Sequence, residues 1–66
     1  MKNEIIEALE AHLEGNIKKH RMNILIMLAN PMAIHDHTDL IGAIETELGH
    51  IAEYHDKLEA LNEVLS

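Results

Sequence analysis

Apolar residues recur at alternating steps of three and four through the second half of the chain. The row consists of Ile41, Ile44, Leu48, Ile51, His55, Leu58, Asn62 and Leu65. This heptad spacing is typical of a helix that packs against another helix. Leu40, Tyr54 and Leu61 each lie one residue before a position of this row, so the apolar stripe is wider than one partner helix requires. The pattern predicts a helix over residues 38–64 with more than one neighbour.

The first half of the chain has a similar periodicity. Its row consists of Ile6, Leu9, Leu13, Ile17, His20, Ile24 and Met27. Two steps of four follow one another in this row, which predicts a stutter near Gly15 and a locally straighter supercoil. Asn3 is a suitable N-cap, and the pattern predicts a helix over residues 3–29.

Pro31 ends the first helix, because proline lacks an amide hydrogen and keeps the residue before it out of the α region. Residues 30–37 are expected to form the turn, and Asp36 or Thr38 to cap the second helix. A turn this short makes the two helices antiparallel. The predicted fold class is therefore all-α, with a single helical-hairpin domain over residues 1–66.

The composition calls for a further source of stability. A chain of 66 residues buries only about 60% of its unfolded surface, and without Cys no disulfide contributes. Apolar residues make up 47% of the chain, more than one hairpin can enclose. We therefore expect the hairpin to dimerise into a four-helix bundle. The predicted core and dimer positions are Ile17, His20, Ile24, Met27, Ile44, Leu48, Ile51, His55, Leu58 and Asn62.

Three of these positions are polar. Histidines on an apolar stripe are usually neutral core residues that hydrogen-bond to a partner, which is our interpretation of His20 and His55. Asn62 is expected to fix the register of the helices, as a single polar residue at a heptad core position does.

The net charge of the chain and its distribution limit the classes of binding partner. The net charge of -7 argues against general affinity for nucleic acid or for anionic membranes. A local basic cluster consists of Lys18, Lys19 and Arg21. The antiparallel register places it level with Glu45, Glu47 and Glu53, which we expect to neutralise it. Acidic residues crowd the end of the hairpin that carries both chain ends, so an antiparallel dimer that separates these ends is favoured.

The longest apolar run covers residues 24–29, which is far short of the roughly 20 residues of a membrane span. The N-terminus is not followed by the apolar core of a signal peptide. We therefore expect a cytoplasmic protein without a membrane partner.

Two stretches of the chain resemble known proteins. They are Asn30-Pro31 through His35-Asp36-His37-Thr38-Asp39-Leu40-Ile41, and the acidic stretch that ends Asp56-Lys57-Leu58-Glu59. Together they are similar to short uncharacterised helical-hairpin proteins of marine tailed phages and related bacteria, a resemblance that implies no activity. In architecture alone, the expected dimer is also similar to the plasmid copy-number regulator Rop, a hairpin dimer that binds paired RNA loops.

The six histidines raise the question of a metal site. His35 and His37 flank Asp36 with a spacing that can chelate zinc or nickel, and Asp39 could complete the ligand set. Two histidines alone are too few, however, and the N-terminus of a helix repels a cation. Capping of the helix explains Asp36 and Asp39 equally well.

Glu47 and His50 have the Glu-x-x-His spacing of helical di-iron sites. Such a site also needs a carboxylate from the facing helix, and the level opposite Glu47 offers none. Both residues are predicted to flank the heptad row without entering it, which favours a solvated surface.

No catalytic residue and no cofactor are predicted, because the chain lacks Cys, has few hydroxyl side chains and has no glycine-rich phosphate loop. We predict a non-enzymatic oligomerisation, protein-interaction or regulatory module, whose partner is a second copy of itself or another protein. One alternative is a zinc- or nickel-binding protein that uses the His residues. Another is a Rop-like RNA-binding regulator that uses the basic cluster with Asn16 and Asn23.

Overall fold

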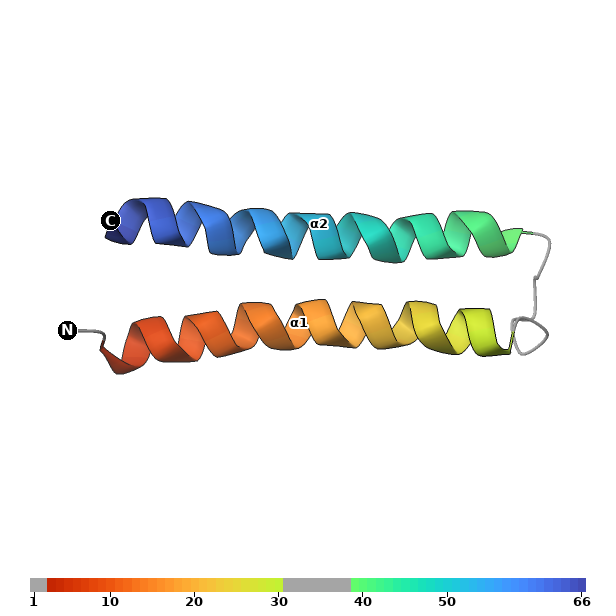
Figure 1. The fold of residues 1–66 in the computed structure, drawn as a ribbon, viewed down its shortest axis with the longest axis horizontal. Helices are drawn as coiled ribbons and strands as arrows, with labels where there is room; N and C mark the ends of the chain where they lie inside the picture. Colours follow the sequence, from red (N-terminus) through yellow and green to blue (C-terminus); the bar gives the residue numbers. More distant parts are fainter. Residues whose placement is uncertain (1–2, 31–38) are drawn as a thin grey trace.

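The computed structural model describes residues 3–30 and 39–66. Its two α-helices, α1 (Glu4–Ala29) and α2 (Leu40–Leu65), run antiparallel and lie side by side along their whole length (Figure 1). No strand occurs in the described part of the chain. The predicted all-α helical hairpin is confirmed, with α2 beginning two residues later and ending one residue later than expected.

Helix α1 begins where Asn3 caps it. The Oδ1 atom of Asn3 accepts a hydrogen bond from the backbone N–H of Ile6 at 3.0 Å, as the sequence predicts. The first turn is acidic, which suits the positive end of the helix macrodipole. At the other end, the N–H of Asn30 still donates to the carbonyl of Ile26 at 3.0 Å.

Helix α2 begins at Leu40, with Asp39 in the N-cap position. The Asp39 side chain makes no capping hydrogen bond, and its carboxylate lies in the space that a Cβ at Gly42 would take. The alternative caps Asp36 and Thr38 lie outside the described residues, as does the predicted turn after Asn30.

Each of the two helices contacts the other through one regular heptad row of residues. On α1 the buried and half-buried row is Ile6, Glu10, Leu13, Ile17, His20, Ile24 and Met27. On α2 the half-buried row is Leu40, Ile44, Glu47, Ile51, Tyr54, Leu58 and Leu61. The steps alternate between four and three throughout, as in antiparallel coiled-coil packing, and we call the two rows together the hairpin seam.

The row on α1 passes through Glu10 and leaves Leu9 exposed. The predicted stutter near Gly15 is therefore wrong, since it followed from placing Leu9 in the row. With Glu10 in the row the heptad spacing is regular, so no stutter is required. An acidic residue near the end of the row can be tolerated because it is only half-buried.

Helix α2 is rotated by one residue relative to the predicted row. The residues that belong to both rows are Ile44, Ile51 and Leu58, which we call the shared row. The predicted positions that the structure leaves exposed are Ile41, Leu48, His55, Asn62 and the last one, Leu65, and we call the first four the outer row. The rotation turns Tyr54 and Leu61 toward α1 in place of His55 and Asn62, and a tyrosine and a leucine bury more apolar surface than a histidine and an asparagine. Leu40 replaces Ile41 at little change in apolar burial, whereas Glu47 replaces Leu48 at a loss.

The hairpin by itself has little interior. Among the described residues, Leu13 (5% exposed) is the buried apolar side chain and His20 (9% exposed) is the buried polar one. Large apolar side chains that remain exposed are Ile5, Leu9, Met22, Leu25, Ile26, Leu28, Ile41, Leu48, Val64 and Leu65. Two helices therefore leave much of the apolar surface of this chain in contact with water.

Candidate functional site

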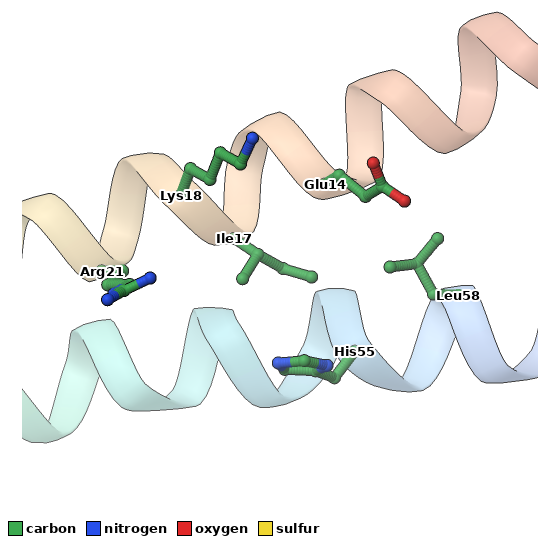
Figure 2. Close-up of a pocket in the computed structure, with 6 residues that line it drawn as sticks. All are labelled: Glu14, Ile17, Lys18, Arg21, His55 and Leu58. Atoms are coloured by element: carbon green, nitrogen blue, oxygen red, sulfur yellow. The ribbon is translucent and has the colours of Figure 1, made fainter.

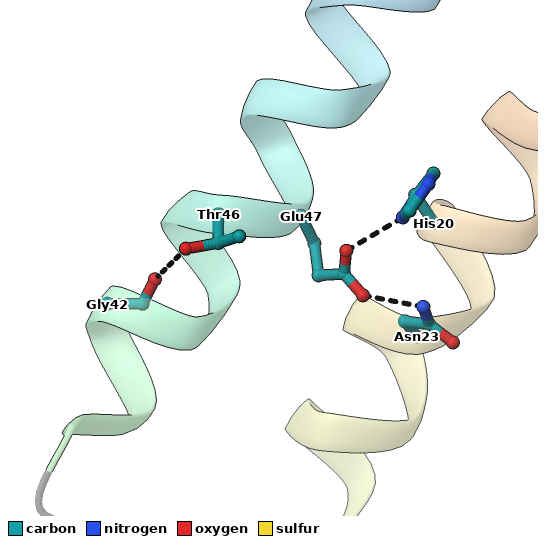
Figure 3. A network of polar contacts seen from close by, with 5 residues as sticks. All are labelled: His20, Asn23, Gly42, Thr46 and Glu47. Atoms are coloured by element: carbon teal, nitrogen blue, oxygen red, sulfur yellow. Dashed lines mark hydrogen bonds and ion pairs between the residues drawn. The ribbon is translucent and has the colours of Figure 1, made fainter.

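A cluster of polar side chains interrupts the hairpin seam near its middle. The Glu47 carboxylate accepts hydrogen bonds from Nδ1 of His20 at 2.7 Å and from Nδ2 of Asn23 at 2.5 Å (Figure 3). The side chains of His20 and Glu47 are only 11% and 13% exposed. We call His20, Asn23 and Glu47 the polar layer, and it links α1 to α2 through both oxygens of one carboxylate.

Aromatic rings extend the polar layer along α2. The ring of His50 stacks on that of His20, with centroids 4.5 Å apart and an angle of 23° between planes. Tyr54 lies beyond, with its ring centroid 6.1 Å from that of His20. The Lys57 ammonium lies 5.0 Å from the Tyr54 ring centroid and 3.0 Å from the Glu53 carboxylate.

The environment of Glu47 favours its ionised form. Burial raises the pKa of Glu47, but the hydrogen bonds from His20 and Asn23 lower it. The charge that His20 and His50 carry when protonated also lowers it, and together these effects hold the pKa below the ordinary value of 4.5. At neutral pH the layer therefore contains a carboxylate that accepts two hydrogen bonds.

On the surface, the hydrogen bond and the charge of Lys57 lower the pKa of Glu53. The same contact with Glu53 raises the pKa of Lys57.

The position of Glu47 corrects an expectation. We predicted that Glu47 flanks the seam, and it lies in the seam because α2 is rotated. The level facing it presents His20 and Asn23 and no carboxylate, so a di-iron ligand set is not assembled within the hairpin. Within residues 3–30 and 39–66, no group of three His, Asp or Glu side chains is placed to hold a metal ion.

The predicted zinc or nickel site falls mostly outside this range. His35, Asp36 and His37 are not among the described residues, and the fourth candidate, Asp39, stands at the start of α2. Metal binding by these residues stays a prediction.

Two of the three carboxylates that were expected to neutralise the basic cluster have other partners. Glu47 is engaged by His20 and Asn23, and Glu53 pairs with Lys57, its neighbour on the same helix. Within the described part of the chain, neither of these carboxylates pairs with Lys18, Lys19 or Arg21, so the predicted charge pairing is wrong for Glu47 and Glu53.

One side of the hairpin is hollowed. A shallow depression of about 290 Å³ is lined by Glu14, Ile17, Lys18, Arg21, His55 and Leu58 (Figure 2). Ile17 and Leu58 project into the space between the two helices, while Lys18 points away from α2 (Figure 2). A second depression continues along α1 and is lined by Lys18, Arg21, Met22 and Leu25. We call this side the open face, formed by the outer row of α2 together with Glu14, Lys18, Arg21 and Leu25 of α1.

The predicted core and dimer positions thus divide into two groups. Those in the hairpin seam are Ile17, His20, Ile24, Met27, Ile44, Ile51 and Leu58. Those outside it are Leu48, His55 and Asn62, all on the outer row. The roles of Asn23 and Glu47 were not predicted, although the apolar residues Leu40, Tyr54 and Leu61 mark the edge of the stripe to which Glu47 belongs.

No protein-family model, no curated protein and no solved structure matches the chain. The resemblance to phage hairpin proteins and the architectural similarity to Rop stay predictions. Neither α1 nor α2 is long and apolar enough to cross a membrane.

Proposed function

We propose that the protein is a non-enzymatic oligomerisation module, in which two hairpins pair into a four-helix bundle. The observation that carries the proposal is the amount of apolar surface that one hairpin leaves in water. Ile41 is 85% exposed and Leu48 is 54% exposed, although both continue the heptad pattern of a packed helix.

The surface area supports a partner of similar size. The chain has an accessible surface of 5200 Å². A compact monomer of the same mass would have about 4200 Å², so the hairpin exposes roughly 1000 Å² in excess. A stable protein–protein contact buries about 800 Å² on each partner, which a second hairpin could supply.

A second copy fits this surface better than nucleic acid or a metal ion does. The net charge of -7 opposes phosphate binding, and the described part of the chain has no grouped metal ligands. The bundle would act by holding two chains, and whatever they contact, at a fixed distance. A regulatory role follows if the assembled bundle also binds another protein.

Sedimentation velocity at micromolar concentration tests the proposal. The expected result is a species of at least twice 7.5 kDa with high helix content by circular dichroism. A monomer that is fully helical and melts cooperatively at the same concentration would overturn it.

A further inference from the structure

We infer that the second copy packs on the open face, with its connecting segment at the opposite end of the bundle from that of the first. The inference rests on the proposed dimer and adds the face and the orientation. The occupant that we infer is a second copy of this chain, because the apolar residues and the charges of the open face are complementary to the same face of another copy.

The outer row has the heptad spacing of a helix contact, but it lies outside the hairpin seam. Together with the shared row it forms the unbroken series of threes and fours predicted for α2, whereas the contact with α1 uses the other edge of the same stripe. A helix with two overlapping heptad rows is typical of bundles with more than two helices. The occupant of the open face is therefore a helix pair.

Charge fixes the orientation. The end of the hairpin opposite the connecting segment is acidic, and the carboxylates nearest to it belong to Glu4, Glu7, Glu10, Glu59 and Glu63. Two such ends side by side would repel each other. In the opposite orientation they lie about 39 Å apart, the length of a 26-residue helix. This separation is several Debye lengths at physiological salt.

The open face is also complementary to itself in this orientation. Glu14 and Lys18 lie on either side of the midpoint of α1, and both line the depression. A two-fold axis perpendicular to the helices at that level places Glu14 of one copy near Lys18 of the other, twice. In the same way, Leu48 and His55 lie on either side of the midpoint of α2, so Leu48 packs against an imidazole ring of the second copy.

Spin labels test the orientation, and the absence of Cys makes single labels simple to introduce. In separate variants, Ala52→Cys and Glu63→Cys carry a nitroxide, and pulsed electron spin resonance measures the distance between the two copies. Position 52 lies at the middle of α2 and should give about 20 Å or less. Position 63 should give more than about 30 Å, because each residue adds 1.5 Å of axial separation in each copy.

Each outcome decides the orientation. A short distance at both positions would place the two acidic ends together and overturn it. A monomeric wild type in sedimentation would instead overturn the proposed function, so the two failures are distinguishable.

A charge on the outer row tests the face. Leu48→Lys should raise the dissociation constant of the dimer at least about tenfold, since it would bury an unpaired ammonium. Ile26→Lys is the matched control, because Ile26 is 58% exposed and lies on the side of α1 away from α2 and from the depressions. It should leave the dissociation constant unchanged.

Loss of helix by Leu48→Lys, with Ile26→Lys still helical, would support the same face, because the two side chains are similarly exposed in the single hairpin, at 54% and 58%. Dissociation by Ile26→Lys with an unaffected Leu48→Lys would place the contact elsewhere and overturn the inference.

Discussion

Glu47 connects the two helices through a single carboxylate. Its two oxygens accept hydrogen bonds from His20 and from Asn23, and all three side chains are at least half-buried. Polar groups in such a position stabilise the fold only while every partner is present, because each unsatisfied buried group costs free energy. The layer therefore favours the one register in which Glu47 lies level with His20.

Glu47→Ala should lower the free energy of unfolding by about 1 to 3 kcal/mol, because it leaves two buried donors without an acceptor. Urea denaturation at a fixed protein concentration measures the change. Glu53→Ala is the control, since the Glu53–Lys57 pair is on the surface and its loss should leave the free energy of unfolding nearly unchanged. Similar losses for both variants would mean that the polar layer does not form.

The layer also predicts a pH dependence. The pKa of Glu47 lies below its ordinary value in the folded protein, so the unfolded chain binds the proton more readily. The stability contributed by the carboxylate is therefore fully present above about pH 4.5 and is lost as the pH falls through the folded pKa. Melting temperatures of wild type and Glu47→Gln should differ at pH 6 and converge as the pH falls through the folded pKa of Glu47. A difference that does not vary with pH contradicts the assignment.

At the scale of the helices, burial is concentrated in a narrow line. Leu13→Ala should cost about 2 to 5 kcal/mol, as truncation of a buried leucine does. Ile5→Ala, on the same helix and 79% exposed, should cost no more than about 0.5 kcal/mol. Denaturant unfolding of the two variants compares them directly, and a larger effect at Ile5 would require a different contact line along α1.

Gly15 provides a test in the stabilising direction. A Cβ at this position would meet nothing within 4 Å, and the residue lies inside a regular helix. Gly15→Ala should therefore raise the free energy of unfolding by about 0.5 to 1 kcal/mol, because glycine loses more backbone entropy than alanine. A destabilised variant would show that another helix approaches Gly15 closely.

The helices themselves could be predicted because their signals are local. Periodicity located both elements, Asn3 gave the start of α1, and Pro31 gave the limit of its end. The rotation of α2 could not be predicted in the same way, since the stripe on α2 is wide enough to face α1 with either edge. The choice depends on the partners that α1 offers, above all on His20 and Asn23 for Glu47, and these become neighbours only once the two helices are aligned.

At the scale of the whole molecule, folding should depend on concentration. If two chains unfold together, the melting temperature rises with protein concentration by mass action. For a dimer of this size, a tenfold increase should raise it by about 5 °C. Circular dichroism melts over two decades of concentration measure this, and a constant melting temperature would indicate that single chains fold alone.

The overlapping rows on α2 have a consequence for how this protein can change during evolution. In the proposed dimer, substitutions on the outer row alter the choice of partner and leave the hairpin intact, whereas substitutions at Leu40, Tyr54 or Leu61 alter the hairpin alone. The shared row would take part in both contacts, so a change at Ile44, Ile51 or Leu58 would affect the hairpin and the proposed dimer together. Divergent copies of this gene could therefore acquire separate partners through Ile41 and Leu48 while keeping the same hairpin.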